Sequence, residues 1–163
     1  MRRVYHGATR EITSPLVHVG REHLDFGRGF YLTDIRSQAK TWAFIKARYQ
    51  MNGQACINEY LFDFDNAIKA FRYKVFEQYD SEWLHFIVNS RDGLKVWKDY
   101  DIIEGGVAND RIIDTVEAVK AGQISEEKAL EELSRHQPNN QICILNQKVV
   151  DQYLNFKKSI IIE

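Results

Sequence analysis

Two short segments near the start of the chain combine residue types that suit a ligand site. The first is Tyr5-His6-Gly7, which places a histidine and a glycine at the end of an expected strand. The second is Phe26-Gly27-Arg28-Gly29-Phe30-Tyr31-Leu32-Thr33, with two glycines one residue apart before an aromatic strand. Glycine lets a ligand approach the backbone closely, and an aromatic ring can stack on a planar, cationic heterocycle. Taken alone, each segment is more typical of a structural histidine or a tight turn, so only their combination carries weight.

The composition predicts one globular domain that spans residues 1–163. Hydrophobic residues make up 44% of the chain and charged residues 28%, a balance typical of folded domains rather than disordered segments. Pro15 and Pro138 are the only prolines, and neither a low-complexity stretch nor a repeat suggests a linker. The two cysteines, Cys56 and Cys143, have apolar or strand-like neighbours, which favours buried, reduced thiols over a disulfide.

Charge and the N-terminus disfavour several functions. The net charge is -1, so no overall field would draw the protein to nucleic acid. No apolar run follows Arg2 and Arg3, and no stretch approaches the ~20 residues of a membrane span, so we expect a cytoplasmic protein that does not enter the membrane. The five histidines show no metal-ligand spacing, so no metal is expected.

Hydrophobic periodicity predicts strands and helices in an irregular order. Strands are expected at 3–7, 29–33, 54–64, 100–103, 141–145 and 156–162, with a brief one at 16–19. Helices are expected from an N-cap at Asp34 to Gly53, after Asp80, over 110–121, after Ser125 and over 147–153. Because these elements do not alternate as in parallel βαβ units, the sequence predicts an α+β fold.

Together and in this order, the two glycine-containing segments resemble the first two signature segments of the ADP-ribosyltransferases, in the diphtheria-toxin and poly(ADP-ribose) polymerase branch. That branch opens with a strand bearing His-Gly and continues with a Gly-x-Gly-aromatic-Tyr strand and a helix, here the helix with Gln38 and Trp42. The resemblance implies a split mixed β-sheet core with peripheral helices, and NAD as substrate. The whole chain is also similar to an uncharacterised bacterial family of this superfamily. Members of that family are often encoded beside a small partner protein, which implies a toxin–antitoxin role.

The resemblance also implies roles for individual residues. His6 would hydrogen-bond the adenosine-side ribose of NAD, the backbone of Gly7 would hold the nicotinamide amide, and Tyr31 would stack on the nicotinamide ring. The rest of the NAD-binding segment would be Gly27, Arg28, Gly29 and Phe30. Cleavage of the nicotinamide–ribose bond develops oxocarbenium character on the sugar, so such a site must hold the dinucleotide bent, with the leaving group against an aromatic wall.

The third family element departs from the pattern. Superfamily members carry a glutamate at the start of a late strand, and the corresponding residue here is Gln141. Its amide can hydrogen-bond a ribose hydroxyl, but it carries no charge and cannot act as a base. Candidate replacement acids are Asp101, Asp110 and Glu59. Asp110 could instead cap a helix, and Glu59 could instead face solvent.

The resemblance therefore implies an NAD-dependent mono-ADP-ribosyltransferase that releases nicotinamide and modifies a macromolecule, either protein or nucleic acid. The expected catalytic residues are Tyr31, Gln141 and Asp110. The alternatives are a catalytically weak or inactive module that binds NAD or ADP-ribose, and an NAD glycohydrolase in which water replaces the acceptor. Polymer synthesis is not expected, because an uncharged residue at position 141 cannot activate an incoming ribose hydroxyl.

Overall fold

The strands form two sheets in the computed structural model, which describes residues 1–135 and 139–163 except the side chain of Asp110. The first sheet is antiparallel, in the order β1–β3–β7, with β1 at Arg2–Ala8, β3 at Cys56–Phe62 and β7 at Leu154–Ile161. The second is mixed, in the order β2–β6–β5–β4, with strands at Phe30–Leu32, Gln141–Ile144, Ile102–Gly105 and Tyr73–Val75. Only β4 and β5 run parallel in it.

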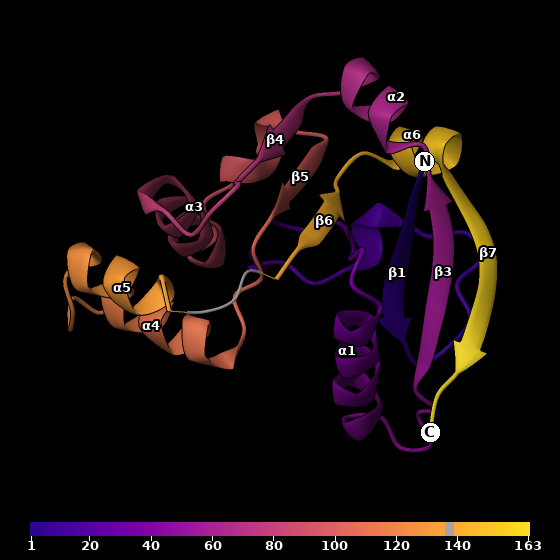
Figure 1. Ribbon diagram of the computed structural model, residues 1–163, viewed down its shortest axis with the longest axis horizontal. Helices are drawn as coiled ribbons and strands as arrows, with labels where there is room; N and C mark the ends of the chain where they lie inside the picture. Colours follow the sequence, from indigo (N-terminus) through magenta and orange to yellow (C-terminus); the bar gives the residue numbers. More distant parts are fainter. Residues whose placement is uncertain (136–138) are drawn as a thin grey trace.

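Six α-helices surround the sheets in the described part of the chain. Helix α1 (Arg36–Arg48) packs along β1, and α2 (Phe64–Ala70) and α6 (Gln147–Tyr153) lie near the N-terminus (Figure 1). Helices α3 (Ser81–Arg91), α4 (Asp110–Lys120) and α5 (Glu126–Leu133) lie together beside the second sheet (Figure 1). This architecture confirms the prediction of an α+β fold with a mixed sheet core and helices outside it.

Two apolar cores account for the hydrophobic patterns in the sequence. The first joins the two sheets to α2 and α6, and its largest fully buried members include Leu32, Tyr60, Phe62 and Phe64. The second packs α3, α4 and α5 against β5 and β6, and it includes Trp83, Leu84, Ile87, Ile103, Ile112 and Val116. Each large apolar side chain buried in this way contributes about 1.5–3 kcal/mol to folding. Cys56 and Cys143 are both buried and free, as predicted.

A single bridge joins β1 of the first sheet to the end of β2. The N–H of Tyr5 donates to the Thr33 carbonyl at 2.8 Å, and the N–H of Thr33 donates to the Tyr5 carbonyl at 3.0 Å. An antiparallel ladder would continue with Gly7 opposite Tyr31, but the strands diverge there. Side chains take over the two carbonyls: His6 Nδ1 lies 2.6 Å from the Tyr31 oxygen, and Lys46 Nζ donates to the Gly7 oxygen at 2.7 Å. The two sheets are therefore joined at Tyr5 and Thr33 and separate toward Gly7 and Tyr31. We call the space between the separating strands the fork.

Two predictions for the first third of the chain are wrong in detail. Ile35, not Asp34, is the N-cap of α1, because the Thr33 hydroxyl accepts the Ile35 N–H while Asp34 accepts from the side chain of Asn140. The brief strand predicted at 16–19 is a 3-10 helix at Val17–Val19. Its first N–H donates to the side chain of Gln147 rather than to a neighbouring strand.

Three short elements were not predicted. They are α2, β4 and a 3-10 helix at Val96–Asp99. A three-residue strand shows no usable alternation, and β4 exists only because it pairs with β5, which lies almost thirty residues further on. At the start of α4, Asn109 rather than Asp110 provides the cap, since the Asn109 side chain accepts the N–H of Ile112.

Candidate functional site

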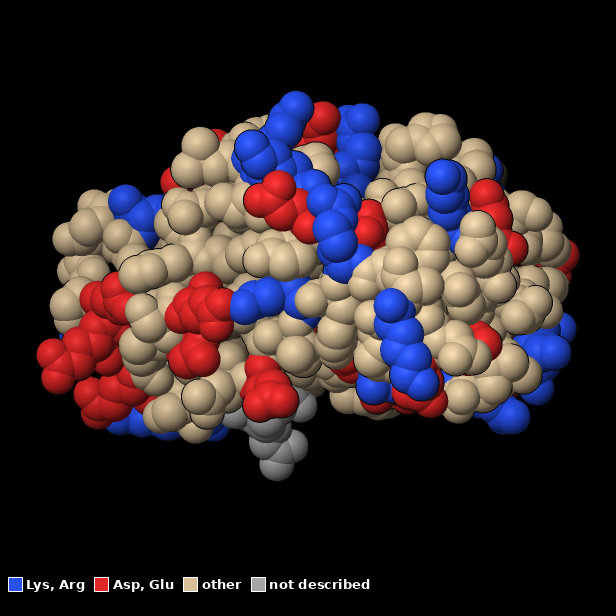
Figure 2. Space-filling model, turned by 90° about the horizontal axis from the view of Figure 1, so that it is seen from above, with Lys and Arg blue, Asp and Glu red and all other residues tan. Residues whose placement is uncertain are grey.

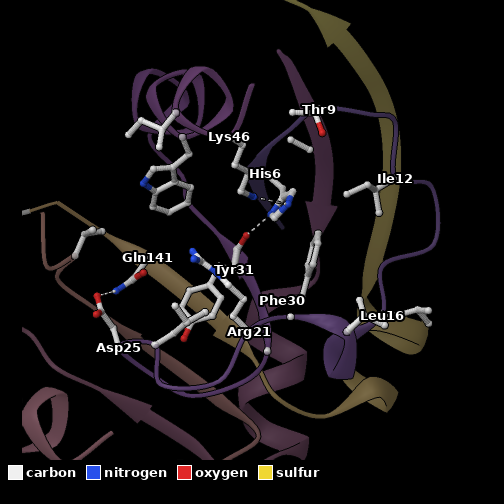
Figure 3. Close-up of a pocket in the computed structure, with 18 of the residues that line it drawn as sticks. His6, Thr9, Ile12, Leu16, Arg21, Asp25, Phe30, Tyr31, Lys46 and Gln141 are labelled. Carbon is white, nitrogen blue, oxygen red and sulfur yellow. Dashed lines mark hydrogen bonds between the residues drawn. The ribbon is translucent and has the colours of Figure 1, made fainter. Parts of the chain in front are cut away.

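A cavity of about 800 Å³ lies in the fork between β1 and β2 (Figure 3). This is a typical volume for a site that encloses a cofactor-sized ligand, roughly 300–1,000 Å³. Its walls come from β1, β2, α1, the loop before β2, the start of β6 and the segment before α4. Five residues predicted to form the site line it: His6, Gly29, Phe30, Tyr31 and Gln141. The fold thus brings together residues from three distant parts of the sequence.

His6 is held as a neutral ring with one defined tautomer. Burial and the neighbouring Lys46 ammonium lower the pKa of His6 to about 3, although the contact with the Tyr31 backbone opposes this. Because the Tyr31 carbonyl can only accept, His6 Nδ1 must carry the proton. Nε2 is then an acceptor, and Lys46 Nζ lies 3.3 Å from it. The Phe30 ring stacks on the imidazole at 4.4 Å between centroids, which fixes its plane.

Gly7 has a packing role that the sequence pattern did not predict. A Cβ at this position would lie 2.1 Å from the carbonyl oxygen of Ala39 and 2.7 Å from the backbone nitrogen of Ala43, both in α1. Only glycine lets β1 approach the helix so closely. Its carbonyl faces the fork, where Lys46 contacts it, so a backbone contact between Gly7 and a ligand stays a prediction.

Tyr31 lines the cavity with its ring and uses its hydroxyl to hold the glycine turn. The hydroxyl donates to the Gly27 carbonyl at 2.6 Å and accepts the N–H of Phe26 at 3.0 Å. Burial raises the pKa of Tyr31 well above its ordinary value, so the phenol stays neutral. The hydroxyl is therefore occupied by the turn, and the ring is the part left for a ligand.

The residues of the glycine turn divide into two groups. Gly29 lines the cavity, and a Cβ there would lie 2.5 Å from the Cys143 sulfur. Gly27 has a φ of +88° and packs against the Trp97 ring, where a Cβ would lie 2.4 Å from Cγ. Arg28 pairs with Glu22 at 3.0 Å. Neither Gly27 nor Arg28 lines the cavity, so they shape the turn rather than its ligand-facing wall.

Gln141 lines the cavity beside Asp25, a carboxylate that no sequence pattern predicted to belong to the site. The Gln141 amide donates to Asp25 Oδ2 at 3.0 Å and to the Gly106 carbonyl at 3.2 Å (Figure 3). Asp25 in turn accepts from the guanidinium of Arg91 and from the N–H of Ala108. An aspartate at the end of a loop gives no signal in the sequence, because its partners lie 66 or more residues away.

The acids considered as replacements for a glutamate at position 141 lie elsewhere. Glu59 contacts Arg3 and Lys158 on the neighbouring strands, and it does not line the cavity. Asp101 also lies outside the cavity, where its carboxylate accepts hydrogen bonds from Arg72 and Asn146 next to β5. Asp110 is the first residue of α4, and its side chain lies outside the described residues.

Asp101 is instead a structural carboxylate, and Asp101→Ala is expected to lower the stability by about 2 kcal/mol, or about 5 °C in Tm. The carboxylate accepts three bonds from Arg72 and one from Asn146. Burial opposes ionisation, but these bonds hold the pKa of Asp101 below its ordinary 3.8. The contribution of Asp101 to the free energy of unfolding is therefore present above about pH 4 and is lost as the pH falls further.

Thermal unfolding at pH 7 and pH 3 tests this role of Asp101. The difference in Tm between Asp101→Ala and the unmodified protein should shrink at pH 3. The exposed Asp114, on α4, provides the control, since Asp114→Ala should change Tm little at either pH. Equal losses for the two variants at pH 7 would contradict the assignment.

Positive charge dominates the cavity. Arg10, Arg21 and Lys46 line it, and none of them has an acidic partner among the described residues. Arg91 also lines it but is paired with Asp25. The Lys46 side chain is exposed, but desolvation by the protein atoms around it, followed by the nearby Arg21, lowers its pKa to about 8.

This surplus of cations is local. The whole chain has a net charge of -1, and acidic side chains gather over the end of the molecule that carries α3 to α5 (Figure 2). Arg10, Arg21 and Lys46 are exposed at the cavity, and cations of one sign gathered in a concave site favour an anionic ligand because their fields add there.

The structure is an α+β fold with a cavity, lined by several basic side chains, between β1 and β2. Residues 2–156 match the family described as "Protein of unknown function (DUF3990)", so the chain belongs to this family. No curated protein and no solved structure matches the chain. Within residues 1–135 and 139–163, no helix is long and apolar enough to span a bilayer. In the same residues, no three His, Cys, Asp or Glu side chains are grouped as metal ligands would be.

Proposed function

We propose that this protein binds NAD in the fork cavity and acts as a mono-ADP-ribosyltransferase that releases nicotinamide and modifies a macromolecule. One observation carries the proposal. His6, Tyr31 and Gln141, which the resemblance assigns to one NAD site, line one cavity although they come from three separate segments. A cytoplasmic location and a small antitoxin partner rest on the sequence and the resemblance, and we retain them as part of the proposal.

The charge of the cavity supports a dinucleotide as the ligand. The diphosphate of NAD carries two negative charges, and the cavity offers Arg21 and Lys46 close to one another and Arg10 on the loop after β1. Charge-assisted hydrogen bonds from such groups to phosphate oxygens are roughly twice as strong as neutral ones. A neutral or cationic ligand would leave these three groups uncompensated.

In the proposed reaction, the bond between the nicotinamide nitrogen and ribose C1′ breaks, and its electron pair leaves with nicotinamide. The Tyr31 ring provides the flat wall for the leaving group, and the Gly7 backbone faces the fork where the carboxamide would lie. Gln141 would accept a hydrogen bond from a ribose hydroxyl as the sugar becomes cationic. A nucleophile of the acceptor then bonds to C1′, and its proton passes to solvent.

Nicotinamide release from NAD tests the proposal and separates its alternatives. Purified protein is incubated with NAD labelled in the adenylate part, with and without a cell lysate, and both free nicotinamide and labelled macromolecules are measured. Release with a labelled acceptor supports the transferase. Release without one in any lysate favours the NAD glycohydrolase, and tight NAD binding without release favours the binding module.

Arg21→Gln is expected to raise the Kd for NAD by about tenfold, which corresponds to about 1.4 kcal/mol. Arg21 lines the cavity and makes no ion pair among the described residues, so the change removes a cation from the ligand's surroundings without breaking a fold contact. Calorimetric titration with NAD measures the effect.

Arg48→Gln is the matched control for Arg21→Gln. Arg48 is exposed at the end of α1 and does not line the cavity, so this variant removes the same charge from the chain away from the ligand. Its Kd for NAD should change less than twofold. If the two variants weaken binding equally, the effect is one of overall charge, and Arg21 has no part in a diphosphate site.

A further inference from the structure

We infer that Asp25 is a positioning residue for Gln141. In the superfamily the negative charge is on a glutamate at the position of Gln141, whereas here it is on Asp25, which contacts Gln141. The reaction in this inference rests on the proposed function, whereas the coupling between the two side chains can be tested without it. On this basis, position 141 requires a glutamine, because its amide can donate a hydrogen bond to Asp25 and a glutamate could not.

The hydrogen bonds of Gln141 fix which way its amide points. Its nitrogen donates to Asp25 Oδ2 at 3.0 Å and to the Gly106 carbonyl at 3.2 Å. Both neighbours can only accept, so the nitrogen and not the oxygen must face them. The amide oxygen is turned away from Asp25 (Figure 3), and none of the described residues donates a hydrogen bond to it. Gln141 is thereby set as an acceptor, which suits a hydroxyl group of a sugar.

Asp25 is itself held firmly by an ion pair with Arg91 and by hydrogen bonds. It is 6% exposed, its Oδ1 accepts from Nε of Arg91 at 3.0 Å and from Nη2 at 2.5 Å, and its Oδ2 accepts the N–H of Ala108 at 3.1 Å. A group fixed in this way can orient Gln141 without moving.

The other titratable groups near Asp25 are Tyr31, Tyr79 and Cys143. Burial raises the pKa of each of the three above its ordinary value, so they are neutral. Arg91 is therefore the counter-charge of Asp25 within the described residues.

This arrangement does not tolerate a glutamate at position 141. Gln141→Glu would place a second carboxylate about 3 Å from Asp25 in a buried site, where two such groups cannot both ionise without strong repulsion. Asp25→Asn would remove the repulsion, because an amide at position 25 carries no charge. The two substitutions together move the negative charge from position 25 to position 141 in the cavity wall.

Four proteins test the coupling: the unmodified chain, Asp25→Asn, Gln141→Glu and the double variant. Nicotinamide release at saturating NAD should fall by about 30-fold or more in each single variant, and the double variant should exceed Gln141→Glu by about tenfold. A residue with a merely structural role would not produce this recovery. A double variant no faster than Gln141→Glu overturns the inference.

Thermal unfolding of the same four proteins tests the coupling without any reaction. Gln141→Glu should lose stability relative to the unmodified chain as the pH rises from 4.5 to 8, because both carboxylates then ionise, and the double variant should lose this pH dependence. If Asp25→Asn does not fold, the pH dependence of Gln141→Glu alone tests the coupling. If Gln141→Glu loses the same stability relative to the unmodified chain at pH 4.5 and at pH 8, the inference is overturned. An unmodified protein that neither binds NAD nor releases nicotinamide refutes the proposed function and leaves the stability result intact.

Discussion

Gln141→Ala is expected to reduce nicotinamide release at saturating NAD by about 100-fold or more, while the Kd for NAD rises only a few-fold. Gln141 lines the cavity with its amide oxygen turned away from Asp25 (Figure 3), and a hydrogen bond from a ribose hydroxyl to this oxygen would strengthen as the sugar becomes cationic. An interaction that is stronger in the transition state than in the ground state lowers kcat when it is removed, and changes ground-state binding little. Single-turnover measurement of release, together with calorimetric titration, separates the two quantities.

Two further variants make this result specific to Gln141. His6→Ala should mainly raise the Kd for NAD, because the neutral His6 ring cannot supply charge and its Nε2 helps to hold the Lys46 ammonium in the cavity. Asp110→Ala tests the remaining replacement acid: if it keeps full activity while Gln141→Ala is inactive, Asp110 has no catalytic part. A Gln141→Ala protein that keeps its rate but binds NAD tenfold more weakly would show that Gln141 serves binding alone.

Gly7→Ala is expected to destabilise the fold by about 3 kcal/mol and lower Tm by about 10 °C. The added Cβ would lie 2.1 Å from the Ala39 carbonyl oxygen and 2.7 Å from the Ala43 nitrogen. Both atoms belong to the backbone of α1, so the helix must move away from β1 to make room. That movement would also shift Lys46, which contacts the Gly7 carbonyl from the same helix, so NAD binding should weaken as well.

Gly122→Ala is the matched control for Gly7→Ala. Gly122 has a φ of +69°, and a Cβ there would meet no atom within 4 Å. This substitution adds the same methyl group and costs about 1 kcal/mol of backbone strain without a clash. Thermal unfolding should therefore show a much smaller loss than for Gly7→Ala. Similar losses for the two variants would mean that α1 adapts to a larger residue and that close packing does not explain the glycine.

Local sequence patterns predicted most of the elements that carry the cavity. The strand with His6, the strand with Tyr31 and the strand that begins at Gln141 are all present. These elements follow from apolar periodicity and glycine punctuation, which depend only on neighbours in the chain. The packing role of Gly7 could not be predicted, because a histidine-glycine pair at a strand end does not reveal which helix packs against it.

The electrostatics of the site could not be predicted in this way. The sequence predicts only a loop that ends at Asp25, yet this residue lies against Gln141, 116 residues further along the chain. By its place in the sequence Asp101 is a candidate catalytic acid, yet Arg72 and Asn146 bind it outside the cavity. Which acidic side chain contacts which partner depends on the tertiary arrangement of the loops, and residue types alone do not reveal it.

The amino-acid sequence by itself therefore determined the α+β class, the positions of the main strands and the three segments that bear His6, Tyr31 and Gln141. Only the tertiary structure decided that β1 and β2 diverge after one bridge, that Lys46 and Arg21 lie together in the resulting cavity, and that Asp25 orients Gln141. The physical reason is the range of the interactions. Periodicity acts over a few residues, whereas the fork and its charges arise from contacts between segments that are distant in the chain.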